Sequence, residues 1–197
     1  MNKGGLFLVI GDSITWTISD EAAVGEDLWT QKLYRWIQSN YGEVQFINKG
    51  FGGAKSDTIL ESRYWLSRFI PDLLLVSTGV NDASNSISIE DYTANLTELV
   101  NIFRKKNPNI LIILCSPTHS TNEPTYDVDD YRTAVASLAT SLNTGIIHLE
   151  NAFTLAQVGT YTVDGLHPNV AGHQLLFETA YPVVESYAAD WLNKIRN

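Results

Sequence analysis

Residues 6–13 read Leu-Phe-Leu-Val-Ile-Gly-Asp-Ser, a short apolar run followed at once by a glycine, an acid and a hydroxyl. The run is continuously hydrophobic rather than alternating, which is typical of a parallel strand covered on both faces. The polar residues after it are expected at the carboxyl edge of a sheet, where ligands bind in open α/β proteins. This stretch predicts a buried first strand that ends at a functional loop.

The same pattern recurs along the chain and alternates with helical spacing. Residues 6–10, 44–47, 73–77, 110–115 and 146–149 are the predicted strands. Apolar stripes at helical spacing pass through Leu28, Leu33 and Trp36; Tyr92, Leu96, Leu99 and Phe103; Tyr131, Val135, Leu138 and Leu142; and Phe177, Tyr181, Val184, Ala188, Trp191 and Ile195. Pro182 is expected to kink or restart the last helix. The alternation predicts right-handed βαβ crossovers and a three-layer α/β/α sandwich.

Length and composition favour one soluble, folded unit. The chain has 197 residues, 44% of them hydrophobic and 18% charged, so we expect a single domain over residues 1–197. A net charge of −9 repels phosphate backbones, and nucleic acid is not an expected partner. The basic run 104–106 is interpreted as a solvated helix C-terminus. Cys115 lies in an apolar run and is interpreted as a buried thiol.

At the start of the chain we expect no targeting signal. Residues 1–10 lack a long apolar region followed by a small-residue cleavage site, and no window approaches a membrane span. As given, the chain is expected to be cytoplasmic. If a leader had been trimmed from it, the protein would instead be secreted, and the chain could also be one module of a larger protein.

Three polar or glycine-containing segments follow predicted strands, and each has two interpretations. Ser13 suits either a nucleophile or a helix cap. The segment 48–53, Asn-Lys-Gly-Phe-Gly-Gly, either presents backbone N–H groups to a ligand or is a turn; it lacks the spacing of a nucleotide-binding loop. Asn81, after the third strand, suits an oxyanion donor or a turn. None of the three is decisive alone.

A fourth segment, Asp-Gly-Leu-His-Pro at 164–168, places Asp164 and His167 three residues apart. This spacing lets an acid and an imidazole face one pocket, although a surface acid beside a structural histidine gives the same pattern. Pro168 is compatible with the start of a following helix. The four segments together favour serine hydrolase chemistry, because nucleophile, donors, acid and base all fall in loops after strands.

With these four segments in this order, the sequence resembles the GDSL/SGNH hydrolase family, whose hallmarks are an N-terminal GDS, an N-x-G-x-x-G loop, a G-x-N-D loop and a C-terminal D-x-x-H. The resemblance spans residues 11–167. It implies a flavodoxin-like fold with a five-stranded parallel sheet, and ester hydrolysis through a Ser-His-Asp triad. The G-x-S-x-G nucleophile elbow is absent, which argues against the ordinary α/β-hydrolase fold.

Residue by residue, the resemblance implies that Ser13 is the nucleophile, His167 the general base and Asp164 the partner of the imidazole. The backbone N–H groups of Ser13 and Gly53 and the side-chain amide of Asn81 would form the oxyanion hole. Two features depart from the family pattern. The first block reads GDSIT rather than the GDSLS type, and the loop segment 117–119 has no assigned role.

No cofactor or metal is expected, because the His, Asp and Glu residues show no ligand spacing. His148, in the fifth predicted strand, and His173, in the last helix, are interpreted as structural. His119 is the loop-borne histidine that is near enough to line the pocket.

The favoured function is an esterase that removes small acyl groups, such as acetyl, from a carbohydrate. No long apolar lid is visible, and Trp16, Tyr126 and Tyr161 are aromatics suited to sugar faces. A lysophospholipase or thioesterase is the alternative enzyme, and a non-catalytic carbohydrate-binding domain on the same fold is the alternative from another class. The sequence leaves open the natural ester, the acyl chain length and the oligomeric state.

Overall fold

The computed structural model describes residues 4–16, 25–121 and 127–196. At its centre lie five parallel strands: β1 (Leu6–Gly11), β2 (Gln45–Gly50), β3 (Leu73–Ser77), β4 (Leu111–Cys115) and β5 (Gly145–Ile147). Their order across the sheet is β2-β1-β3-β4-β5, with parallel pairing throughout. This is the flavodoxin-like order, so the expected fold is confirmed.

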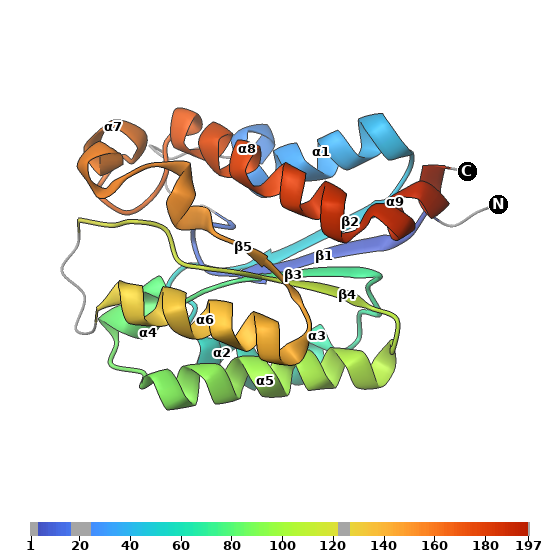
Figure 1. Ribbon diagram of the computed structural model, residues 1–197, viewed down its shortest axis with the longest axis horizontal. Coiled ribbons are helices and arrows are strands. Elements are labelled where there is room, and N and C mark those ends of the chain that lie inside the picture. Colours follow the sequence, from blue (N-terminus) through green and yellow to red (C-terminus); the bar gives the residue numbers. More distant parts are fainter. Residues whose placement is uncertain (1–3, 17–24, 122–126, 197) are drawn as a thin grey trace.

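Helices cover both faces of this sheet (Figure 1). One layer contains α1 (Trp29–Tyr41), α8 (Val170–Tyr187) and α9 (Ala189–Arg196). The other contains α2 (Ser56–Glu61), α3 (Arg63–Leu66), α4 (Val80–Ser84), α5 (Ile89–Lys106) and α6 (Val128–Leu142). Short helical turns are η1 (Gly25–Asp27), η2 (Leu149–Ala152), η3 (Leu155–Gln157) and α7 (Val158–Tyr161). No helix among the described residues is long and apolar enough to cross a membrane.

The continuous hydrophobicity of the strands follows from these two layers. All five residues of β3 are buried. Leu73 and Leu75 pack in the cluster beneath α1 and α8, whereas Leu74 and Val76 pack in the cluster beneath α5 and α6. Cys115 is 1% exposed, in agreement with the expectation of a buried thiol. Each central strand is therefore apolar on both sides because both sides are core.

Two predicted helix boundaries differ from the structure. Helix α8 does not restart at Pro182 but continues through it, and the break falls at Ala188, before α9. Ala180 and Val184, on either side of the proline, are fully buried, so packing holds the helix despite the missing N–H donor. Pro168 does not start α8 either, because Asn169 is its N-cap and accepts a hydrogen bond from the Gly172 N–H at 3.0 Å.

His148 was expected in the fifth strand, but β5 ends one residue earlier, at Ile147. The Ser116 N–H donates to the Ile147 carbonyl at 2.9 Å, and the Leu149 N–H donates to the Ser116 hydroxyl at 3.1 Å. These bonds turn the chain out of the sheet into η2. The His148 Nδ1 then lies 3.0 Å from a carboxylate oxygen of Glu150.

Candidate active site

Ser13 stands on the tight turn that follows β1. The Asp12 side chain accepts a hydrogen bond from the Ile14 N–H at 2.9 Å, and the Asp12 carbonyl accepts one from the Thr15 N–H at 3.1 Å. The turn presses against the end of β2, where a Cβ on Gly50 would lie 2.1 Å from the Thr15 hydroxyl. A side chain at position 50 would push the turn away, so the glycine is needed for this close approach. Ser13 is 8% exposed at the carboxyl edge of the sheet.

The loop between α7 and α8 brings His167 to this serine. Its Nε2 lies 2.9 Å from the Ser13 Oγ, a contact between residues 154 positions apart in the chain. Its Nδ1 lies 2.6 Å from the Asp164 Oδ2. The other oxygen of Asp164 accepts hydrogen bonds from the N–H groups of Leu166 and His167, at 3.0 and 2.7 Å. The structure thus joins the three residues expected to form a triad into one chain of hydrogen bonds.

The protonation states of this chain follow from its partners. Burial favours a raised pKa for Asp164, but the hydrogen bonds from the His167 side chain and from two backbone N–H groups outweigh it and lower the pKa below 3.8. Asp164 is therefore a carboxylate near neutral pH and can only accept hydrogen bonds. In a neutral imidazole whose Nδ1–H donates to Asp164, Nε2 is the atom that can accept the Ser13 hydroxyl proton.

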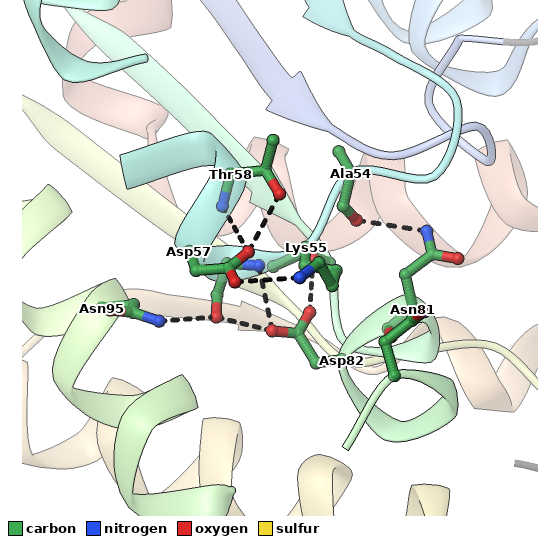
Figure 2. A network of polar contacts seen from close by, with 10 residues as sticks. Ala54, Lys55, Asp57, Thr58, Asn81, Asp82 and Asn95 are labelled. Atoms are coloured by element: carbon green, nitrogen blue, oxygen red, sulfur yellow. Dashed lines mark hydrogen bonds and ion pairs between the residues drawn. The ribbon is translucent and has the colours of Figure 1, made fainter. Parts of the chain in front are cut away.

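The two other residues expected to supply oxyanion donors lie on neighbouring loops. Gly53, after β2, has a φ of +72°, a conformation that favours glycine. Asn81 stands in the first turn of α4, after β3, and its side-chain amide donates to the Ala54 carbonyl at 3.1 Å (Figure 2). This bond uses one of the two amide N–H groups. The structure therefore brings the Asn81 amide against the residue next to Gly53.

Asn48 is a supporting residue whose role sequence reasoning missed. Its amide nitrogen donates to the Thr15 carbonyl at 2.8 Å and to the Thr30 hydroxyl at 3.1 Å, and its oxygen accepts from the Gly50 N–H at 2.9 Å. Asn48 thereby ties the serine turn to β2 and α1. The N-x-G spacing was the available signal, but it was interpreted for its glycines alone.

The loop after β4, which had no assigned role, supports the histidine loop. The Ser120 hydroxyl and the Thr121 N–H both donate to the Gly165 carbonyl, at 3.0 and 2.9 Å. Gly165 lies between Asp164 and His167, so these bonds hold the loop that carries both residues.

Asp12 is a second feature that sequence reasoning missed, since its side chain is 2% exposed beside the serine. Burial, with Asp82 nearby, raises the pKa of the Asp12 carboxyl from 3.8 to about 7, although the Ile14 N–H and His167 lower it. In the unfolded chain this carboxyl loses its proton near pH 3.8, whereas in the folded protein it keeps it until about pH 7. Ionisation therefore favours the unfolded state increasingly as the pH rises between these values, and no further above them.

Replacement of Asp12 by asparagine is expected to remove this pH dependence, because the amide keeps an acceptor for the Ile14 N–H but carries no titrating proton. The melting temperature of Asp12→Asn relative to the wild type should rise by several degrees between about pH 4 and 7 and then level off. Thermal melts from pH 4 to 8 measure this difference. Asp130→Asn, at an exposed position of α6, controls for the loss of one negative charge. A difference that stays constant with pH would contradict the buried, protonated carboxyl.

The remaining histidines divide as follows. His173 is fully buried and its Nδ1 accepts from the Trp29 N–H at 3.3 Å, which supports a structural role. His119 was expected to line the active-site pocket; it lines a pocket of about 190 Å³ together with Asp129 and Arg132, and none of the three residues expected to form the triad lines that pocket. Burial, followed by the nearby Arg132, lowers the pKa of His119. Among the described residues, no group of three His, Cys, Asp or Glu side chains could hold a metal ion.

The aromatics expected near the site differ in their surroundings. Trp16, three residues after Ser13, is 44% exposed. Tyr161 is partly buried and packs on Phe153, with ring centroids 5.8 Å apart. Tyr126 lies outside the described residues.

The chain is similar to known proteins in both sequence and fold. The chain matches the GDSL-like Lipase/Acylhydrolase family over residues 9–175. It is similar to the solved structure of Axe2, an acetylxylan esterase from Geobacillus stearothermophilus, with a TM-score of 0.76 and 23% identity over 92% of this chain and 94% of that one. It is also similar to a lipase/acylhydrolase from Enterococcus faecalis, with a TM-score of 0.76 and 22% identity over 92% of this chain and 96% of that one. No curated protein matches the chain significantly.

Proposed function

Because the chain belongs to the GDSL-like lipase/acylhydrolase family and is a carboxylic ester hydrolase, we propose that Ser13 is its nucleophile, His167 its general base and Asp164 the partner of the imidazole. The observation that carries this proposal is the continuous chain of hydrogen bonds, 2.9 Å from Ser13 Oγ to His167 Nε2 and 2.6 Å from His167 Nδ1 to Asp164 Oδ2. These contacts have the lengths that general-base activation of a serine requires. They favour an enzyme over a non-catalytic domain on the same fold.

In the first half of the reaction, the Ser13 oxygen attacks the acyl carbon while its proton passes to His167 Nε2. The carboxylate of Asp164 stabilises the imidazolium that forms. The tetrahedral intermediate collapses when His167 returns this proton to the departing alcohol, and the acyl group remains on Ser13. In the second half, His167 takes a proton from water as the water oxygen attacks the acyl-enzyme. The second tetrahedral intermediate then collapses, His167 returns this proton to the Ser13 oxygen, and the carboxylic acid leaves.

The negative charge that develops on the carbonyl oxygen of the ester needs hydrogen-bond donors to stabilise it. We assign this role to the N–H groups of Ser13 and Gly53 and to the Asn81 amide. The bond from Asn81 to the Ala54 carbonyl supports this assignment, because it holds the amide beside residues 51–54, the Gly53 loop. Fixed donors of this kind stabilise the intermediate more than the neutral ester.

We propose small acyl esters of carbohydrates as substrates. Trp16, half-exposed near the serine, offers a ring for a sugar face. Among the described residues, the large apolar side chains that are exposed within three positions of the triad are Trp16, Val163 and Val170, which are separate from one another in the sequence. We infer that they offer little surface for a long acyl chain. The fold shared with an acetylxylan esterase adds support.

A chain-length series is expected to separate this substrate class from a lysophospholipase or thioesterase. We expect kcat/KM for p-nitrophenyl decanoate to be no higher than that for p-nitrophenyl acetate, since a CH₂ group that no apolar site buries gains none of its usual ~0.8 kcal/mol. Initial rates below the solubility limit of the longer ester measure this ratio. A preference that increases with chain length would contradict the proposal and favour a lipid substrate, whereas the triad assignment would stand.

A further inference from the structure

Two consecutive residues of α4 hold the segment at the far end of the Gly53 loop. Asn81 donates to the Ala54 carbonyl at 3.1 Å. The Asp82 Oδ1 accepts from the Ser56 N–H at 2.9 Å and from the Ser56 hydroxyl at 2.5 Å. Figure 2 shows both side chains turned from α4 toward this segment. Three hydrogen bonds thus join α4 to the segment 54–56.

Asp82 has no exposed surface, and its other oxygen accepts from the Thr78 hydroxyl at 3.0 Å. Burial raises the pKa of the Asp82 carboxyl, while the Ser56 and Thr78 donors act to lower it. The Ser56 hydroxyl in turn accepts from the Asn95 amide of α5 at 3.0 Å. A continuous polar network therefore runs from the end of β3, through Asp82 and Ser56, to α5.

The Gly53 loop depends on its two ends for its position. Apart from its two chain neighbours, no described residue has a heavy atom within 4 Å of the place where a Cβ of Gly53 would be, and Gly53 is exposed. Before it, the Phe51 N–H donates to the Gly11 carbonyl at 3.0 Å. After it come the bonds to Ala54 and Ser56. The contacts of Asn81 and Asp82, together with the burial of Ala54 in the core, therefore anchor the loop on its far side.

We propose that Ser56 and Asp82 are positioning residues that hold the Gly53 N–H in register with the Asn81 amide, so that both donors meet the same acyl oxygen. This inference rests on the proposed function. The physical reason is that a displacement of about 1 Å at a reacting centre can cost on the order of 10²-fold in rate. Neither residue touches substrate, and both act through the loop and the helix that carry the donors.

Ser56→Ala tests the proposal, with Ser88→Ala as the matched control. Ser88 caps α5 through a 3.0 Å bond from the Asp91 N–H, so its loss costs stability without touching the Gly53 loop. Ser56→Ala is expected to lower kcat about tenfold with KM nearly unchanged, and Ser88→Ala to leave both constants within about twofold of the wild type. The Ki of a trifluoromethyl ketone, which mimics the tetrahedral intermediate, should rise in Ser56→Ala by the factor by which kcat falls.

Two further variants complete the test. Asp82→Asn keeps an oxygen acceptor for Ser56 and presents an amide to the Thr78 hydroxyl, which can rotate to accept it, so kcat should stay within about threefold of the wild type. Asn95→Ala removes the outer bond to Ser56 and should lower kcat about threefold; it serves as the test if Ser56→Ala does not fold.

Several results would overturn the positioning role: an unchanged kcat in a folded Ser56→Ala, a loss that appears in KM, or an equal loss of kcat in Ser88→Ala. An active Ser13→Ala would instead overturn the proposed function, so the two failures are distinguishable.

Discussion

Exchange of Ser13 for alanine is expected to lower kcat for ester hydrolysis by about 10⁴–10⁶-fold while the fold persists. The mutation removes the only atom that forms the acyl-enzyme, and His167 is left with no hydroxyl to activate. Ser13 lies on a turn at 8% exposure, so the loss of its oxygen creates no large core cavity. Residual turnover would come from the oxyanion donors and from substrate binding.

Turnover of p-nitrophenyl acetate, a thermal melt and labelling by a fluorophosphonate together test this expectation. The wild type should take up one equivalent of label and Ser13→Ala none, with melting temperatures within a few degrees of each other. Ser141→Ala, which removes an exposed hydroxyl from α6, should label and turn over as the wild type does. Activity or stoichiometric labelling that survives in Ser13→Ala would mean that another residue is the nucleophile.

Asn81→Ala is expected to lower kcat by about 10²–10³-fold, roughly 3–4 kcal/mol, with a much smaller change in KM. When the serine attacks, the carbonyl oxygen gains charge and moves, and an amide N–H aimed at its new position gains more there than against the neutral ester. The backbone donors of Ser13 and Gly53 would retain the remaining catalysis. The mutation also removes the Ala54 contact, so part of the loss comes from a less well-positioned Gly53 loop.

Kinetics and a melting curve on the same variant distinguish this role from that of a turn residue. Asn85→Ala is the matched control, because Asn85 follows α4, is exposed and donates to the Asn81 carbonyl at 2.8 Å. It should lose comparable stability and keep its kcat. If Asn81→Ala only melts earlier, with kcat per folded molecule nearly unchanged, then Asn81 is a turn residue and the oxyanion assignment is wrong.

The five strands could be predicted from the sequence because each one is a short run of mainly apolar residues. A strand buried on both faces must be apolar at every position, and β3 was predicted at the bounds that the structure shows. The strand order followed from the family resemblance, and the structure confirms it. The proposed catalytic residues were also named from the resemblance, because four short motifs occur in the family's order although each motif alone also suits a turn or a cap.

Other features, such as helix continuity, strand ends and the burial of acidic side chains, depend on contacts between distant parts of the chain and were decided by the tertiary structure. The helix that passes through Pro182 is held by buried neighbours, and the short β5 ends where the Ser116 hydroxyl captures the Leu149 N–H. No role was assigned to Asp12 or Asp82 from the sequence, yet both are buried and Asp12 has a strongly raised pKa.

What the sequence by itself determined is the fold class, through strand and helix periodicity, and the candidate residues for ester hydrolysis, through four motifs. What only the tertiary structure decided is how these residues meet: the 2.9 Å contact between Ser13 and His167, and the anchoring of Ala54 and Ser56 by α4. A local pattern reports which side of an element is buried, because burial repeats with the period of that element. A hydrogen bond between two loops depends instead on strand order, loop length and the packing of both faces, and these are properties of the folded chain as a whole.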